Sequence, residues 1–245
     1  GTLAGVSGFG SLCTGAVLED CVNEGAITGP ATYLGGLAAE AQTGVSIIRC
    51  GNKGTVKSTY NKTSTSACQS IGGLIGSCNP NELTDCYNTG KIEFTNPVAI
   101  YGVGGLIGTA NGDAAAPEGL RLTGCYNTAD IEAGWTIGGL VGNVNATAAM
   151  PNPMVLRRCY NSGNLTSKAT ASKSSTGMGG LLALFTPGTL VDSCYNTGTI
   201  TQSAKCTYAG GLIGYYKIAP TEALPMTISN SYNAGTVNAV GNQGG

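Results

Sequence analysis

The stretch Cys194–Ile200, which reads CYNTGTI, decides the fold because the chain repeats it. Close copies stand at Cys86–Ile92 (CYNTGKI) and Cys125–Ile131 (CYNTADI), and weaker copies occur elsewhere. A catalytic motif is usually needed once. A phrase that keeps returning is typical of a structural unit that stacks on copies of itself. The sequence therefore predicts a repeat architecture.

Aligning the chain on itself gives seven units, each with two phrases. The first phrase is of the type IGGLIG, as at Ile71–Gly76, and the second is CYNTGTI or a variant of it. The units average about 35 residues, and their differences in length fall in two linking stretches, as expected for a solenoid whose insertions loop out of one core. The longest links, which we expect to project from one side, are residues 109–121, 143–155 and 215–227.

Alternate positions of the second phrase keep their character from unit to unit. One parity holds a cysteine, an asparagine, a glycine and an aliphatic residue, while the other is mostly polar. Only Ala129 replaces the glycine. A period of two predicts strands. Asparagine tolerates the left-handed backbone region and glycine adopts it freely, so Asn-x-Gly predicts a corner.

In the first phrase, the aliphatic residue before the glycine pair and the leucine after it are three positions apart, as Ile71 and Leu74 are. A straight strand cannot point both side chains inward. We therefore expect a corner or bulge at the glycines, with the leucines inside.

These patterns predict an all-β fold: a single parallel, right-handed β-helix of about seven coils, one unit per coil. At the strand spacing, seven coils would make a rod of about 33 Å. Residues 1–245 form one domain in this interpretation. Gly244 and Gly245 look like the opening glycines of an eighth unit. We therefore expect the segment to be a fragment of a longer array, because solenoids end in polar caps.

Charged residues favour in-register stacking. At the position before the cysteine, the first two units carry Asp20 and Arg49. Seven positions after it, units two and three carry Lys57 and Glu93. If each unit forms one coil, these opposite charges lie on neighbouring coils, although each exposed pair contributes little stability. Glu93 followed by Glu132 is an exception.

The composition argues against several classes of function. The chain carries 12 Lys+Arg against 13 Asp+Glu, and a net charge of -1 is unlike a nucleic-acid-binding surface. It has no histidine, the commonest general base and metal ligand. No apolar run reaches the roughly 20 residues of a membrane helix. We therefore expect no cofactor, no metal, no nucleic-acid partner and no direct membrane insertion of this segment.

The phrases GGLIG and CYNTGTI together resemble the GLUG-motif repeat family. Its Gly-Leu-hydrophobic-Gly phrase stands at Gly73–Gly76, Gly105–Gly108, Gly139–Gly142 and Gly211–Gly214, while units one, two and six depart from it. The resemblance covers essentially the whole chain. It implies a β-helical, extracellular module of a bacterial surface protein with an adhesive or stalk role. The family supplies no catalytic residues to carry over, and its ligands are generally undefined.

The recurring polar and sulfur positions are expected to be structural ladders. Small thiols stack well inside a coil, and their spacing is not that of a zinc site, so we expect reduced, buried cysteines. Bridges Cys13–Cys21 and Cys78–Cys86 stay open as an alternative. The asparagine amides are expected to bond to backbone or to the next amide. The two ladders consist of Cys21, Cys50, Cys86, Cys125, Cys159 and Cys194, and of Asn23, Asn52, Asn88, Asn127, Asn161, Asn196 and Asn233.

The best binding candidate is a column of tyrosines that faces outward by parity. It could form a flat aromatic strip for a sugar or a protein, although plain packing on the sheet is the simpler interpretation. The strip consists of Tyr87, Tyr126, Tyr160, Tyr195 and Tyr232.

Three function hypotheses compete. The first is a non-catalytic adhesin or stalk module on a bacterial surface that binds an unknown glycan or protein ligand of the host or the bacterium. The second is a polysaccharide lyase or glycoside hydrolase on a β-helix, which should gather carboxylates and a base on adjacent coils. The sequence pairs most acids with bases and shows no carboxylate cluster. The third is ice binding through outward threonines such as Thr197 and Thr199, which lysines on the same face disfavour.

Overall fold

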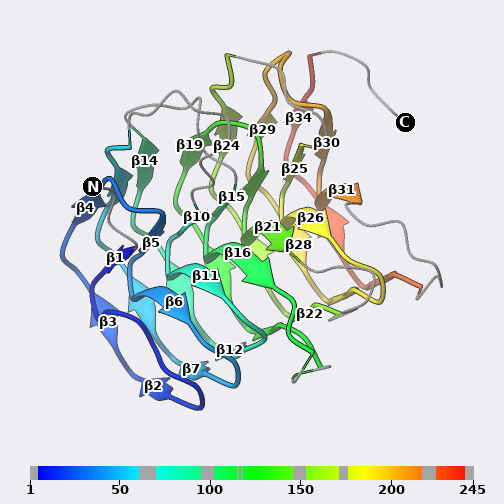
Figure 1. The fold of residues 1–245 in the computed structure, drawn as a ribbon. Helices are drawn as coiled ribbons and strands as arrows, with labels where there is room; N and C mark the ends of the chain where they lie inside the picture. Colours follow the sequence, from blue (N-terminus) through cyan, green and yellow to red (C-terminus); the bar gives the residue numbers. More distant parts are fainter. Residues whose placement is uncertain are drawn as a thin grey trace.

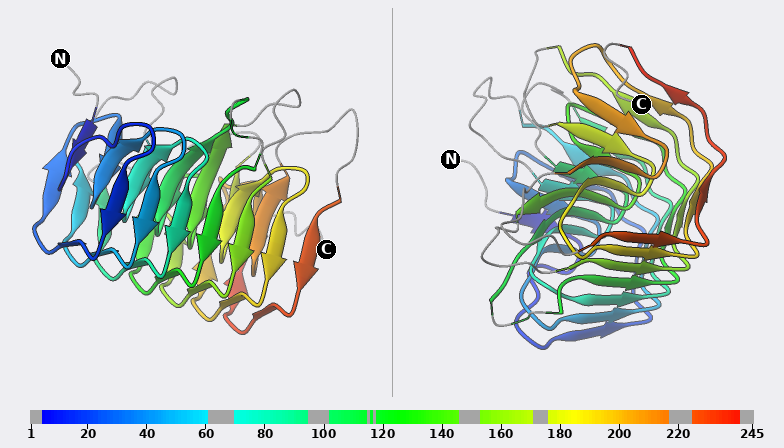
Figure 2. Two further views of the ribbon diagram at one scale, coloured as in Figure 1. Left: turned by 90° about the horizontal axis from the view of Figure 1, so that it is seen from below. Right: turned by 90° about the vertical axis from the view of Figure 1, so that its right-hand side faces the viewer.

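The computed structural model describes residues 5–60, 70–94, 102–114, 116, 118–145, 153–170, 176–216 and 225–240. These residues form an all-β parallel solenoid and contain no helix (Figures 1 and 2). Accordingly, none of them belongs to a helix that could cross a membrane. The chain passes through five sheets in turn, and each strand lies beside its counterpart in the next unit (Figure 2).

The first phrase of each unit forms strands in two sheets, A and B, which meet at the glycine pair. Sheet A holds β1 (Gly5–Ser7), β5 (Tyr33–Gly35), β10 (Ser70–Gly72), β15 (Gly102–Gly104), β20 (Ile137–Gly138), β25 (Gly177–Gly179) and β30 (Tyr208–Gly210). Sheet B holds β6 (Ala38–Ala41), β11 (Ile75–Cys78), β16 (Ile107–Asn111), β21 (Val141–Asn145), β26 (Leu182–Phe185) and β31 (Ile213–Tyr216).

The second phrase and the residues before it form sheets C, D and E. Sheet C holds β2 (Val17–Glu19), β7 (Ser46–Ile48), β12 (Glu82–Thr84), β17 (Arg121–Thr123), β22 (Val155–Arg157), β27 (Leu190–Asp192) and β32 (Thr227–Ser229). Sheet D holds β3 (Val22–Asn23), β8 (Gly51–Asn52), β13 (Tyr87–Asn88), β18 (Tyr126–Asn127), β23 (Tyr160–Asn161), β28 (Tyr195–Asn196) and β33 (Tyr232–Asn233). Sheet E holds β4 (Ile27–Gly29), β9 (Val56–Ser58), β14 (Ile92–Phe94), β19 (Ile131–Ala133), β24 (Leu165–Ser167), β29 (Ile200–Thr201) and β34 (Val237–Asn238).

The pairing register equals one sequence unit. Asn88 pairs with Asn52 on one side and Asn127 on the other, and Ile92 pairs with Val56 and Ile131. Equivalent residues therefore stack in columns along the axis, as the repeated phrase predicts.

The described residues form two apolar clusters in the interior. One contains the leucine that follows the glycine pair together with the cysteine column, as with Leu74 and Cys86. The other contains the aliphatic residue before the glycine pair and the aliphatic end of the second phrase, as with Ile71 and Ile92. The leucines are inside, as expected, and the residues three positions earlier are buried as well, because the chain turns at the glycines and each residue faces a different cluster.

The left-handed backbone lies three residues before the asparagine and not in the Asn-x-Gly corner. The asparagine and glycine of Asn-x-Gly do not have positive φ in the described units. The residue before the cysteine does, with φ of 52° at both Asp85 and Arg158, and Gly124 holds the same position at 66°. The predicted corner itself is confirmed, because the chain bends at the glycine, as at Gly90, between sheets D and E, but without positive φ. The left-handed residue makes a second turn, between sheets C and D, in a mixed column of charged and small residues that carries no glycine signal.

We predict that Arg158→Gly stabilises the protein by about 0.5–1 kcal/mol, because glycine adopts the left-handed region without the steric cost that a side chain incurs. Denaturant unfolding would measure the change. The reciprocal variant Gly124→Ala should destabilise, and a gain in stability from both substitutions would contradict the assignment of strain to this corner.

Candidate functional site

The seven asparagines form one continuous hydrogen-bonded ladder in sheet D. Each Nδ2 donates to Oδ1 of the asparagine in the next unit, with distances of 2.8 Å for Asn52 to Asn88 and 2.9 Å for Asn88 to Asn127. The same Nδ2 also donates to the carbonyl oxygen two residues ahead, as Asn127 does to Ala129 at 2.9 Å. The inner members are completely buried, so the ladder satisfies polar groups that water cannot reach.

The ladder packs directly against the second glycine of the first phrase and separates the two apolar clusters. A Cβ at Gly105 would lie 2.5 Å from Cγ of Asn127 and 2.0 Å from the carbonyl oxygen of Gly139 in the next unit. Gly139 stands in the same relation to Asn161 and Gly180. The second glycine of the first phrase and the asparagine of the second phrase are therefore in direct contact across the interior of the coil, although they are far apart in the sequence.

The cysteines of the column are stacked free thiols. Cys50, Cys86, Cys125, Cys159 and Cys194 are fully buried, while Cys21 in the first unit is partly exposed. Each buried thiol lies near backbone carbonyls, as Cys125 does to Leu83 and Thr123. The alternative bridges Cys13–Cys21 and Cys78–Cys86 are not formed, since all four thiols are free.

Burial makes two of the thiols poor acids, Cys50 of this column and Cys78 of β11. It raises the pKa of Cys78 from its ordinary value of 9.0 to about 12 and that of Cys50 to about 11. A thiol whose pKa is raised by folding stays neutral inside while the unfolded chain ionises, so its stabilising contribution is complete below pH 9.0 and is lost as the pH rises toward the folded value.

We therefore predict that the free energy of unfolding falls above about pH 9, by about 2 kcal/mol for Cys78 alone at pH 10.5. Denaturant titrations at pH 8 and pH 10.5 would measure the loss. Cys78→Ala should show a smaller fall with pH, and an identical fall would show that this thiol is not the source.

The tyrosines line up as predicted, but they do not form a flat aromatic surface. Ring centroids of Tyr126 and Tyr160 are 4.9 Å apart with an interplanar angle of 3°, and those of Tyr160 and Tyr195 are also 4.9 Å apart. The rings are stacked face to face along the axis, and the ring of Tyr87 covers Gly51. The strip consequently presents ring edges and hydroxyl groups, with one half-exposed ring, Tyr232, at its end. A sugar cannot lie flat on the inner rings.

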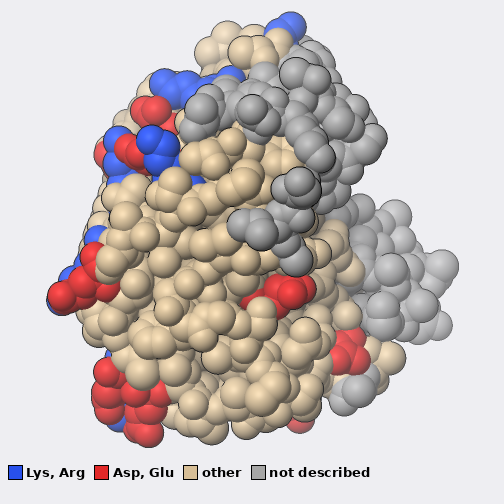
Figure 3. Space-filling model, turned by 60° about the vertical axis from the view of Figure 1, so that its left-hand side comes forward, with Lys and Arg blue, Asp and Glu red and all other residues tan. Residues whose placement is uncertain are grey.

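Acids and bases from neighbouring units pair along the rod. Asp20 contacts Arg49 at 2.7 Å, Glu24 contacts Lys53 at 2.9 Å, and Figure 3 shows basic and acidic side chains lying side by side along one edge of that face. The guanidinium of Arg49, by hydrogen bonding, holds the pKa of Asp20 below its ordinary value. Opposite charges at equivalent positions of the first two units, as predicted from the sequence, therefore form ion pairs in the structure.

One charged hollow, here named the lysine hollow, was missed by the sequence interpretation. It has a volume of about 360 Å³ and lies over sheet E. Two glutamates of neighbouring units, Glu93 and Glu132, line it together, a combination that the sequence analysis did not interpret as a site. The signal was present, because these are the two like charges that broke the alternation. The described residues that line it are Lys57, Lys91, Ile92, Glu93, Phe94, Glu132 and Lys168.

Each glutamate of the lysine hollow is paired with lysine. Lys91 donates to Glu93 at 2.8 Å, and Lys57 lies 3.9 Å from the same carboxylate. The hydrogen bond from Lys91 lowers the pKa of Glu93. Glu132 lies 3.7 Å from Lys168. In the backbone pairing of the strands, Ile92 and Ile131 are the one register pair between β14 and β19, whereas β14 and β9 share three register pairs.

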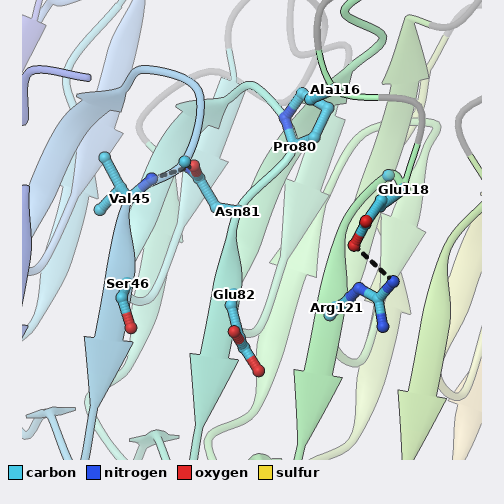
Figure 4. Close-up of a pocket in the computed structure, with 10 residues that line it drawn as sticks. Val45, Ser46, Pro80, Asn81, Glu82, Ala116, Glu118 and Arg121 are labelled. Atoms are coloured by element: carbon cyan, nitrogen blue, oxygen red, sulfur yellow. Dashed lines mark hydrogen bonds and ion pairs between the residues drawn. The ribbon is translucent and has the colours of Figure 1, made fainter. Parts of the chain in front are cut away.

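A second hollow, the link hollow, lies where the link of residues 109–121 leans back over sheet C. Thr43 hydrogen-bonds to Asp113 across two units, and Ala116 and Gly119 of the link line a space of about 320 Å³ (Figure 4). Most of the loop regions of the other two long links fall outside the described residues. That all three long links project from one side therefore stays a prediction.

The side chains of the link hollow come from three neighbouring strands. Ser46 of β7, Glu82 of β12 and Arg121 of β17 are register partners and lie side by side (Figure 4). Arg121 turns away from Glu82 and pairs with Glu118 of the link at 2.8 Å. Asn81, the residue before Glu82, is buried and accepts a hydrogen bond from the backbone N–H of Val45 at 2.8 Å, which joins the chain just before β7 to the chain just before β12.

Comparisons with known proteins give no assignment. No protein-family model matches the chain, and no curated protein matches it either. In the part of the chain that the structure describes, no group of three or more metal-ligating side chains is placed to hold an ion. The sites must therefore be interpreted from their own chemistry.

Proposed function

We propose that this chain is a non-catalytic, extracellular repeat module of a bacterial surface protein, of the GLUG-motif type, with an adhesive or stalk role. In this proposal the rod is right-handed and has seven coils, one per sequence unit. Its ligand is a glycan or a protein of the host or of the bacterium, bound on the outer faces of the coils.

One observation carries this proposal: the recurring asparagines form hydrogen bonds from each unit to the next and so stabilise the stacking. The asparagine ladder runs without interruption from Asn23 to Asn233, and its members between these two ends are fully buried. Because each side-chain amide donates a hydrogen bond to the next unit, the recurrence of the motif has a structural explanation in every unit. A long, regular, rigid rod suits a protein that holds or spaces a binding surface away from a cell.

The paired carboxylates support a non-catalytic role. A general acid of a glycosidase needs a raised pKa. Hydrogen bonds instead lower the pKa of Asp20, Glu93 and Asp192. These groups therefore stay ionised as partners of neighbouring residues.

Two experiments test the proposal. Antibodies raised against the chain should label intact cells that produce the native protein, and labelling only after permeabilisation would contradict an extracellular role. The purified chain should be retained on an array of glycans and matrix proteins, and the double variant Tyr160→Ala and Tyr195→Ala tests whether the tyrosine edge contributes. Failure of retention on every glycan and protein would contradict the adhesive role.

The second candidate function is a polysaccharide-active enzyme, and the lysine hollow is the observation that favours it. Glu93 and Glu132 come from adjacent units and share one space with three lysines. Release of reducing ends or unsaturated products from acidic polysaccharides, abolished by Glu93→Gln or Glu132→Gln, would support this function. Turnover that neither substitution changes would exclude this hollow as its site.

A further inference from the structure

We infer that the link hollow is a binding site for a neutral sugar, with Glu82 and Arg121 as the side chains that contact its hydroxyl groups. The inference rests on the proposed adhesive function and names a ligand class for one surface of the rod. It is independent of the tyrosine strip, whose inner rings have no exposed face for a sugar.

The hollow has the dimensions of a small-molecule site, and hydrogen bonds tie its described walls to neighbouring strands. Its volume of about 320 Å³ lies at the lower end of the range of about 300–1,000 Å³ for ligand pockets, which suits one or two sugar rings and is too small for a folded protein. Two tethers hold its walls: Thr43 bonds to Asp113 of the link, and Val45 donates to buried Asn81. A preformed wall lowers the entropic cost of binding a small ligand.

The side chains offer alternating hydrogen-bond types at the spacing of the strands. Ser46 can donate or accept, Glu82 can only accept, and Arg121 can only donate, and the three stand on adjacent strands about 4.8 Å apart. A polyol, whose hydroxyl groups each donate and accept, matches such a row. Ala116, which is partly exposed, supplies an apolar contact for the carbon face of a ring, while Val45 and Pro80 line the hollow as buried residues.

The charge of the hollow selects against acidic ligands. Glu82 and Glu118 outnumber the single guanidinium of Arg121. Arg121 is engaged by Glu118 at 2.8 Å and leaves Glu82, its register partner, without an ion pair among the described residues. A uronate or sulfate would be repelled by that carboxylate, whereas a neutral hydroxyl pair can donate both protons to it.

Solution NMR with simple sugars tests this inference. The methyl glycosides of glucose, galactose and mannose are titrated into the isotopically labelled chain, at concentrations that cover a Kd of about 1 mM. At least one should give saturable shifts at the backbone amides of Gly44, Val45 and Gly119. Glu82→Gln removes an acceptor charge without changing shape and should weaken binding about 10- to 100-fold. Arg121→Gln should act in the same direction.

Glu24→Gln, at an ion-paired acid outside the hollow, is the matched control and should bind like the native chain. Shifts confined to another face, binding unaffected by Glu82→Gln, or no saturable binding of any of the three sugars would each overturn the inference. If the arrays then still retain a protein or another glycan, the proposed adhesive function stands without this site. If they retain nothing, both fail.

Discussion

Gly105→Ala should be among the most damaging single substitutions in the chain, with a loss of about 3–5 kcal/mol or failure to fold. The added methyl group would lie 2.0 Å from the carbonyl oxygen of Gly139 and 2.5 Å from Cγ of Asn127. Neither neighbour can give way easily, because one is backbone of the next unit and the other is fixed in the asparagine ladder. Denaturant unfolding of the purified variant would measure the loss.

Gly25→Ala is the matched control for this prediction. Gly25 belongs to the first unit, and the nearest atom to its added Cβ is Oδ1 of Asn23 at 3.7 Å, an ordinary contact. It should change stability by less than about 1 kcal/mol. The glycine of the same phrase in an inner unit, Gly198, has the carbonyl oxygen of Gly163 at 2.0 Å from its Cβ position and should cost clearly more. Equal effects at Gly25 and Gly198 would contradict the stacking of one unit on the next.

Asn127→Leu should also destabilise the protein strongly, by about 3–5 kcal/mol, although leucine has a similar size. It removes the bond to Asn161 at 2.8 Å and the bond received from Asn88 at 2.9 Å. It also leaves the backbone of Ala129 without its two contacts to the amide. The stranded groups are buried, so each incurs a desolvation penalty that water cannot relieve.

Asn233→Leu tests whether the effect comes from the ladder or from the residue type. Asn233 is exposed, donates to Gly235 at 2.7 Å and receives one bond from Asn196. Water can replace these partners, so the loss should be about 1 kcal/mol or less. Thermal or denaturant unfolding that ranks Asn233→Leu as severe as Asn127→Leu would show that the buried ladder is not what stabilises the rod.

The structure of the second phrase could be predicted from the sequence. Its residues alternate with a period of two, and the same phrase recurs in each unit, which fixes the strand register. Alternation placed Cys86, Asn88 and Ile92 on the inner side, and the repeat itself specified that Asn88 meets Asn52 and Asn127. In-register stacking leaves no freedom once one unit forms one coil. The charges added an independent check, since Asp20 and Arg49 do form an ion pair.

Other features of the fold depend on contacts between the first and second phrases, and the sequence periodicity of one phrase does not predict such contacts. Ile71 and Leu74 are both buried because the asparagine ladder divides the interior, and nothing in the first phrase alone predicts that division. Parity placed Tyr160 on the outside but did not give the plane of its ring, which is set by the neighbouring tyrosines at 4.9 Å. The link hollow requires the link to fold back to Thr43, a contact between residues 70 positions apart.

The side-chain amides of the asparagines provide the most direct test that one sequence unit forms one coil. In a two-dimensional NMR experiment on the labelled chain, the side-chain amide of Asn127 should show cross-relaxation to those of Asn88 and Asn161, and all three should exchange slowly with solvent. Fast exchange of these buried amides, or contacts that join Asn127 to residues other than its equivalents in the two adjacent units, would contradict the stacked ladder.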